Sequence, residues 1–211
     1  MSVEVIVSFF LAYFIGAIPT SVWFGKIFYR KDVRNFGSGN AGATNTFRVF
    51  GAGAGIIVLI IDIAKGAAAV LLSKLFPVKD FFGDNFLYYQ MALGLTAALG
   101  HIFPVYLNFK GGKGVATFFG VVLTLFPVAA LACTVTFFIL FLITKYVSVG
   151  SIVASLAFMI TILLYYVESA RQIPLILFSL FVPAIIIFTH RENIQRLLSG
   201  RENKFSFSEK N

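Results

Sequence analysis

Carboxylates, histidines and cysteines are all scarce in this sequence. Its 211 residues include 9 Asp and Glu, 2 His and 1 Cys, against 17 Lys and Arg. The single cysteine, Cys133, excludes an intramolecular disulfide, and its place in an apolar run indicates a small packing residue. The sequence contains no cluster with metal-ligand spacing, no Ser-His-Asp order and no cysteine nucleophile. We therefore expect neither a metal site nor any other cofactor.

Charge of either sign is also sparse. Only 12% of the residues are charged, 59% are hydrophobic and the mean hydropathy is +0.91, a balance typical of a polytopic membrane protein. No room remains for a soluble domain, so residues 1–211 are expected to form a single membrane-embedded domain. The net charge of +8 is scattered through short loops and the tail. This pattern favours orientation in a membrane over a nucleic-acid partner.

Long apolar runs cover most of the chain. They are Val5–Phe24, Gly51–Leu72, Phe86–Phe103, Gly114–Thr144, Tyr146–Val167 and Gln172–Thr189. The first follows Glu4 and no basic residue, so we read it as a retained helix and not as a secretory signal. A spanning helix needs about 20 residues, whereas one run has 31 and contains the helix breaker Pro127. Two spans there give an all-α fold with seven transmembrane helices.

The basic residues favour seven spans over six. With seven spans, most of the 17 Lys and Arg residues fall on the side of the C-terminus. The exceptions in outer loops are Lys74, Lys79 and Arg171. Because positive charge marks the cytoplasmic side, we expect the N-terminus outside and the C-terminus in the cytoplasm. Three polar segments, 35–48, 109–117 and 189–203, then all face the cytoplasm and can build one site.

The first polar segment reads GSGNAGATNTFR over Gly37–Arg48. It offers glycines, neutral hydrogen-bond donors and an arginine whose planar guanidinium suits two phosphate oxygens, and it holds no carboxylate. We interpret it as an anion-binding loop in preference to a flexible linker, although it lacks the Lys-Ser/Thr ending of a P-loop. The candidate residues are Ser38, Gly39, Asn40, Thr44, Asn45 and Arg48.

The second polar segment, Lys110–Thr117, reads KGGKGVAT. Glycines let the backbone turn sharply and point several N–H groups at one spot, and the flanking lysines suit a phosphate. A helix beginning at Gly114 would add the partial positive charge of its N-terminus. The candidate residues are Lys110, Gly111, Gly112, Lys113 and Gly114. His101, just upstream, is either a base or a residue that bonds a neighbouring loop, and both readings stay open.

The third segment carries His190 and Asn193, which share a helical face at a spacing of three. Arg201 and Lys204, further on, suit anionic lipid headgroups. Within the second apolar run, Asp62 and Lys65 also stand three apart. A charge at the centre of a spanning helix costs about 2.5 to 3.5 kcal/mol, so we expect these two to pair. Their role, structural or functional, is open.

Four ordered segments resemble the PlsY family of bacterial acyl-phosphate-dependent glycerol-3-phosphate acyltransferases. They read GSGNAGATNTFR, GHIFPVYLNFKGGKGVAT, VSVGSIVAS and THRENIQRLLSG, and the resemblance covers essentially the whole chain. It implies transfer of a fatty acyl group from acyl phosphate to the 1-hydroxyl of sn-glycerol 3-phosphate. The products are lysophosphatidic acid and phosphate, in the first acylation of phospholipid synthesis. The implied location is the bacterial cytoplasmic membrane, with membrane lipids around the protein and no obligate protein partner.

The resemblance also implies roles for residues of these motifs. Ser38, Arg48, Lys113 and His190 are expected to be catalytic. Ser38, Asn40, Arg48 and Lys113 are expected to bind phosphate groups, and His190 and Asn193 to complete the substrate site. The glycines at 111, 112 and 114 would let the backbone approach the donor.

Acyl phosphate is already activated, so positioning and charge stabilisation matter more than a strong nucleophile. This agrees with the absence of a catalytic triad and of the HxxxxD signature, since neither histidine has Asp five residues on. The proton acceptor is either the phosphate of glycerol phosphate or His190. Two alternatives are a transporter for a small phosphorylated anion and a membrane phosphatase. The sequence does not show the repeated broken helices typical of a transporter, nor the nucleophile or metal set that a phosphatase needs.

Overall fold

The computed structural model describes residues 2–76, 82–168 and 172–205, and every regular element within these ranges is helical. Lys79 and Arg171, which the charge pattern places outside, and Lys210 lie beyond the described residues. The chain divides into two compact units, the first ending at Leu125 and the second beginning at Phe126. The expectation of a single domain stays a prediction.

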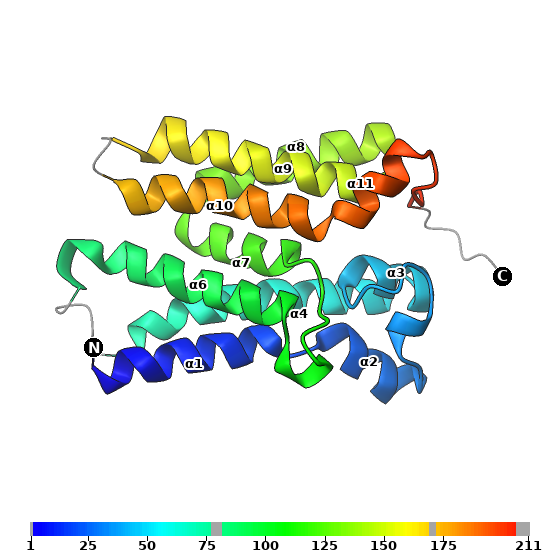
Figure 1. Ribbon diagram of the computed structural model, residues 1–211, viewed down its shortest axis with the longest axis horizontal. Coiled ribbons are helices and arrows are strands. Elements are labelled where there is room, and N and C mark those ends of the chain that lie inside the picture. Colours follow the sequence, from blue (N-terminus) through cyan, green and yellow to red (C-terminus); the bar gives the residue numbers. More distant parts are fainter. Residues whose placement is uncertain (1, 77–81, 169–171, 206–211) are drawn as a thin grey trace. The chain divides into compact units, whose positions relative to one another are not determined.

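The first unit is built around α4, which contacts every other α-helix of the unit (Figure 1). The helices are α1 (Val3–Ala17), α2 (Thr20–Tyr29), α3 (Ala43–Phe50), α4 (Ala52–Leu71), α6 (Phe86–Ile102) and α7 (Val115–Leu125). Short 3-10 turns are η1 (Val33–Asn35), η2 (Leu72–Lys74), η3 (Gly83–Asn85) and η4 (Val105–Leu107). The turns η1 and η4 lie in the segments that lead into the two predicted phosphate loops.

The first apolar run is two helices and not the single helix expected from its composition. Helices α1 and α2 meet at an angle of 45°, with Ile18 and Pro19 between them. Pro19 has no N–H to donate, and its ring restricts the backbone of Ile18, so a helix is disfavoured at this point. Hydropathy alone does not reveal this break, because the run has the length of a single span.

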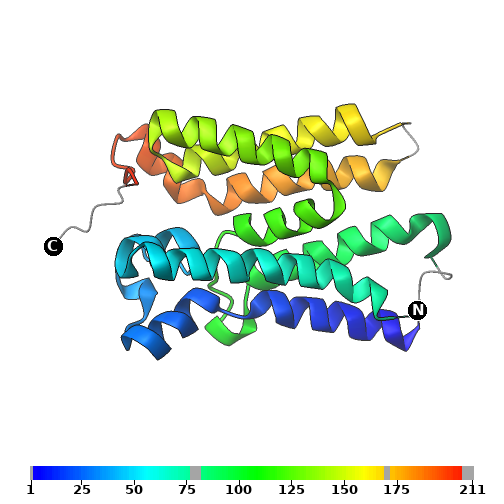
Figure 2. The same ribbon diagram turned by 180° about the vertical axis from the view of Figure 1, so that it is seen from behind.

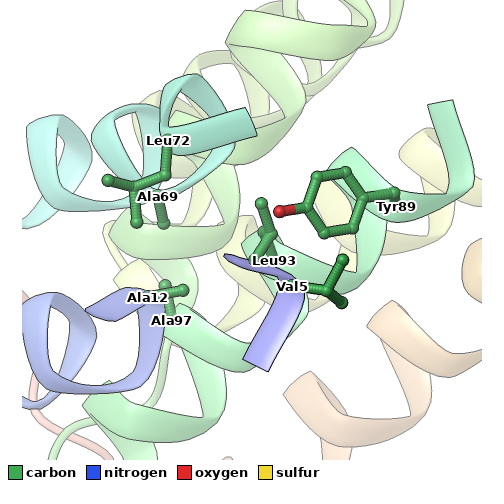
Figure 3. Packing of buried hydrophobic residues seen from close by; sticks show 7 residues of the cluster. All are labelled: Val5, Ala12, Ala69, Leu72, Tyr89, Leu93 and Ala97. Carbon is green, nitrogen blue, oxygen red and sulfur yellow. The ribbon is translucent and has the colours of Figure 1, made fainter. Parts of the chain in front are cut away.

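Small residues let the helices of this unit approach closely. Figure 3 shows the cluster formed by Val5, Ala12, Ala69, Leu72, Tyr89, Leu93 and Ala97. The Tyr89 hydroxyl donates to Ser8 Oγ over 2.6 Å, so the polar atoms in this cluster are satisfied. A Cβ on Gly66 would collide with the Thr117 carbonyl, and one on Gly120 with the Ile63 carbonyl. Helices α4 and α7 therefore pack backbone against backbone, as small residues allow in membrane proteins.

The second unit has three long helices that lie side by side in both views (Figure 2). They are α8 (Pro127–Thr144), α9 (Val147–Thr161) and α10 (Ile173–Thr189), with a π-helical turn at Ile162–Tyr166 and a short final helix α11 (Arg191–Leu198). Phe126 has a non-helical backbone and Pro127 begins α8. The break predicted within the 31-residue run is confirmed.

Four described helical segments are long and apolar enough to cross a membrane, and the number rises to six if each of two bent pairs is one span. The bent pairs are α1 with α2 and α10 with α11. Helix α7 is apolar but has only 11 residues, about half of what a full span requires. The count of seven spans and the orientation of the termini stay predictions.

Candidate functional site

Asn45 holds the first predicted loop in shape. Its side-chain amide donates to the carbonyls of Val33 and Phe36 over 2.9 and 3.1 Å, and its Oδ1 accepts from the Ser38 N–H over 2.8 Å. Both amide hydrogens are thus used within the loop, and the residue is fully buried. A Cβ at Gly37, whose φ is +60°, would collide with this side chain. The geometry favours a supporting role for Asn45 over the predicted direct contact with substrate.

The other candidate residues of Gly37–Arg48 precede or follow Asn45 in the chain. Ser38 and Asn40 are half-buried and Gly39 is exposed in the loop before α3. Thr44 and Arg48 lie four residues apart on α3, so they share one face of a short helix. The segment interpreted as a loop is therefore half loop and half helix, since helix α3 begins at Ala43.

A charge cluster precedes this loop. Arg34 donates to both carboxylate oxygens of Asp32 over 3.0 and 2.8 Å, and the Lys26 ammonium lies 3.5 Å from Oδ2. The hydrogen bond from Arg34, followed by the charges of Arg34 and Lys26, lowers the pKa of Asp32 to about 2. Asp32 therefore stays ionised at neutral pH and caps the turn η1 through the Arg34 N–H.

The glycine and lysine segment rests on the end of α6. The N–H groups of Gly111 and Gly112 donate to the carbonyls of Ile102 and His101, each over 3.1 Å. A Cβ at Gly111 would collide with the His101 carbonyl, and one at Gly112 with the His101 ring. Both glycines are therefore required by close approach. Helix α7 follows at Val115, one residue after the expected start.

The first and second segments are neighbours in the first unit. A Cβ on Gly112 would lie 2.9 Å from the Ala41 carbonyl oxygen, so the two backbones are nearly in contact there. Lys113 is half-buried and Lys110 is exposed on either side of the glycine pair. Gly114 has a φ of +82°, a left-handed conformation that favours glycine at the turn into α7.

His101 and the intramembrane charges form a buried group beneath this segment. The predicted pair of Asp62 and Lys65 is confirmed, with a separation of 2.8 Å between Oδ1 and Nζ. The Thr20 hydroxyl also donates to Asp62 Oδ1 over 3.0 Å, and His101 Nδ1 lies 3.7 Å from the same oxygen. The imidazole thus lies between a carboxylate and the glycine loop. This arrangement agrees better with support of a neighbouring loop than with an exposed base.

His190 and Asn193 belong to the second unit, where both are buried at the start of α11. His190 Nδ1 lies 2.8 Å from the Ile186 carbonyl oxygen. A carbonyl only accepts, so in the neutral ring Nδ1 carries the proton and Nε2 carries the lone pair. The spacing predicts one shared helical face, but His190 has a non-helical backbone at the junction of α10 and α11, and only Asn193 lies within a helix. That they join the first two segments in one site stays a prediction.

Glu202 holds this third segment together, a role that the sequence analysis does not predict. Its Oε1 accepts from Asn193 Nδ2 over 2.7 Å and from Ser148 Oγ over 3.2 Å, and its Oε2 accepts from Arg196 Nε over 2.8 Å. Burial acts to raise the pKa of Glu202, but the bonds and charge of Arg196, with those from Asn193 and Ser148, lower it overall. In the sequence, this role is indicated only by the position of a carboxylate among the basic residues of the tail.

Within the described ranges, no group of three or more His, Cys, Asp or Glu side chains is placed to hold a metal ion. The N–H groups of Gly111 and Gly112 are bonded to the end of α6, so the sequence expectation that they point at a phosphate is wrong for these two.

Comparison with known proteins gives the class. A family model described as glycerol-3-phosphate acyltransferase matches residues 6–200 of the chain. A glycerol-3-phosphate acyltransferase of Macrococcus caseolyticus is 46% identical over 200 residues, covering 93% of this chain and 95% of the relative. One from Chlorobaculum tepidum is 41% identical over 223 residues, covering 95% and 96%. The chain belongs to the glycerol-3-phosphate acyltransferase family.

Solved structures narrow the resemblance further. The glycerol 3-phosphate form of PlsY (YgiH), an integral membrane glycerol 3-phosphate acyltransferase, is similar with a TM-score of 0.81 at 35% identity, covering 96% of each chain. The lysophosphatidic acid form gives a TM-score of 0.80 at 33% identity and covers 97% of each chain. The resemblance to the PlsY family seen in the sequence is confirmed.

Proposed function

We propose that this protein transfers a fatty acyl group from acyl phosphate to the 1-hydroxyl of glycerol 3-phosphate. The products are lysophosphatidic acid and inorganic phosphate, and the reaction is the first acylation of phospholipid synthesis. Membership of the acyltransferase family supports the reaction class. The similar PlsY structures are glycerol 3-phosphate and lysophosphatidic acid forms, which supports the acceptor and the product. Acyl phosphate as donor rests on the sequence motifs.

The observation that carries the proposal is the junction of Ala41 with Gly112. Both reactants carry phosphate, so the reaction needs two anion-binding elements side by side. The first loop, shaped by Asn45, and the second loop, bonded to the end of α6, approach each other at this junction. Neither loop carries a carboxylate that would repel the substrates.

Roles for the side chains follow from their chemistry. Arg48 and Lys113 supply positive charge toward the two phosphates, and charge-assisted hydrogen bonds are the strongest available for such anions. Ser38 and Asn40 donate neutral hydrogen bonds, and the backbone at Gly111 and at the adjoining glycines approaches the donor. His190 and Asn193 complete the substrate site in this proposal, as the sequence resemblance implies.

The proton of the attacking hydroxyl passes, in this proposal, to the phosphate of glycerol 3-phosphate itself. Glu202 is a poor base, because three donors hold it ionised. His190→Ala distinguishes the substrate phosphate from a histidine base. Retained kcat with a raised KM for glycerol 3-phosphate is expected across pH 6 to 9. A kcat that falls at every pH, with an unchanged KM for glycerol 3-phosphate, would assign the proton to His190.

The experiment that tests the function uses the purified protein in detergent with labelled glycerol 3-phosphate and acyl phosphate. Formation of labelled lysophosphatidic acid with release of one phosphate per product is expected. Absence of product would refute the acyltransferase assignment, and uptake of label into sealed vesicles without acylation would favour a transporter.

We further propose that the protein spans the bacterial cytoplasmic membrane seven times, with the N-terminus outside and the site facing the cytoplasm. Cysteine labelling from each side in inverted vesicles tests this orientation.

A further inference from the structure

The break between α1 and α2 leaves backbone groups that need partners. The Ile18 carbonyl has lost its helical donor, since the chain turns at Pro19, and an apolar environment supplies no water in exchange. The Lys65 ammonium donates to this carbonyl over 3.1 Å, and the Thr20 N–H donates to it over 3.0 Å. A charged side chain of α4 is thus bonded to the break itself.

Asp62 connects the same break to the end of α6. Its Oδ1 is 2.8 Å from Lys65 Nζ, accepts from Thr20 Oγ1 over 3.0 Å and lies 3.7 Å from His101 Nδ1. All four side chains are buried. One carboxylate oxygen therefore brings together α2, α4 and α6, three elements that are distant in sequence.

The opposite side of His101 supports the glycine loop. A Cβ on Gly112 would collide with His101 Nε2, and the carbonyls of His101 and Ile102 accept the two N–H bonds of the loop. A small pocket has among its lining residues Ile18, Thr20, Ala41, His101, Gly111 and Gly112. Any shift of α6 relative to α2 is therefore transmitted to the loop that leads into Lys113.

We propose that the Asp62 and Lys65 pair positions the glycine loop for the phosphate of the acyl donor, an inference that rests on the proposed function. A buried ion pair gains little stability over well-packed apolar residues of the same size, because removing two charges from water offsets their attraction. The pair instead sets geometry. Lys65 donates to the Ile18 carbonyl and Thr20 donates to Asp62, and these two bonds fix distances and angles between helices that apolar contacts would not fix. The pair acts through Thr20 and His101, without contact to the reacting atoms.

Thr20→Val tests this inference with little change of shape. The variant loses the hydroxyl bond to Asp62 and keeps the volume of the side chain. The KM for acyl phosphate should rise about tenfold, as expected for loss of a hydrogen bond to a charged group, while the KM for glycerol 3-phosphate changes less than about twofold. A merely structural role would lower the amount of active protein, and hence the maximal rate, with both KM values unchanged.

Thr96→Val is the matched control. Thr96 lies on α6, and its hydroxyl bonds to the Ala92 carbonyl of its own helix over 2.8 Å. This variant should keep both KM values. Trp23, the single tryptophan, provides a readout that needs no turnover, because its ring lies 5.8 Å from that of Tyr106, shortly before the glycine loop. Its emission should shift in Thr20→Val and stay constant in the control.

Removal of the pair gives a second test. Lys65→Met alone leaves a buried carboxylate without its cation and should reduce the yield of folded protein at least tenfold. Adding Asp62→Asn should restore the yield but keep the raised KM for the donor. A double variant with wild-type KM for acyl phosphate, or an unchanged donor KM in Thr20→Val, would overturn the inference while leaving the acyltransferase assignment intact. If the wild-type protein forms no lysophosphatidic acid, the proposed function is refuted. In that case the Trp23 emission still tests the inference, because an unchanged emission in Thr20→Val would refute the positioning of the glycine loop by the Asp62 and Lys65 pair.

Discussion

Gly111→Ala should separate the backbone geometry of the glycine loop from its charge. A Cβ at this position would collide with the His101 carbonyl and would lie 2.8 Å from the Ile102 carbonyl oxygen. Ordinary van der Waals contact begins at 3.4 Å. The loop must therefore move by at least about 0.6 Å, and the collision with His101 demands more. Since Ile102 is also the acceptor for the Gly111 N–H, the movement weakens the bonds that hold the loop.

The loss of activity can be scaled from this movement. A displacement of about 1 Å at a positioned group costs about 100-fold in rate, so kcat/KM for Gly111→Ala should fall between 10-fold and 100-fold by this rough scaling. The two weakened backbone bonds contribute about 0.5 to 1.5 kcal/mol each to stability. The protein should still accumulate in the membrane, because the change is confined to a surface-proximal turn.

The assay is steady-state acylation of glycerol 3-phosphate in detergent micelles with varied acyl phosphate. Gly53→Ala is a matched control, because a Cβ there meets nothing within 4 Å and replacing glycine in a helix favours folding. It should keep full activity. Wild-type kcat/KM in Gly111→Ala would refute the idea that close approach of backbone to backbone places this loop.

Three further predictions test other parts of the site. Lys113→Ala should lower turnover at least 1,000-fold by loss of a charge-assisted bond to phosphate, with a normal melting temperature, whereas the exposed Lys31→Ala should be near wild type; an active Lys113→Ala would overturn the assignment. Glu202→Gln should lower the melting temperature by about 5 °C at pH 7. Because the pKa of Glu202 is lowered on folding, its stabilisation is present above its ordinary value of 4.5 and is lost as the pH falls through the folded value; a melting-temperature difference that does not shrink as the pH is lowered stepwise below 4.5 would contradict this. Asn45→Ala should cost about 2 kcal/mol by removing the three side-chain hydrogen bonds that hold the loop, and Asn45→Asp, which lacks the amide donors, should not rescue it in denaturant titrations.

Hydropathy and helix breakers predict the helices well, because each apolar run is long and its ends carry polar or glycine-rich segments. The break at Pro127 follows from local chemistry and is found where it was expected. The break at Pro19 is not expected from the sequence, because the run around it has the length of one span, whereas the run around Pro127 is too long for one. Pairing of Asp62 with Lys65 was predictable from their spacing, whereas the involvement of Thr20 and His101 was not.

The sequence predicts that the site binds anions, but it does not predict which side chains hold the site in shape. Cations and glycines in short segments indicate anion binding, and the adjacency of the first two segments agrees with it. The supporting roles of Asn45 and Glu202 depend on which carbonyls and donors the fold brings near, and a linear pattern holds no information on that. Both residues looked like ordinary polar members of their motifs.

The length of α7 has a consequence for the surroundings of the protein. Eleven residues rise only about 17 Å, roughly half the thickness of the hydrocarbon layer. A helix this short can serve as one of the seven proposed spans only if the lipids thin around it or the segment before it, residues 110–114, also lies within the hydrocarbon layer. Either adjustment carries a hydrophobic mismatch energy that depends on chain length. The fatty acids that such an acyltransferase helps to install would thus set the thickness of the layer that its own short helix must match.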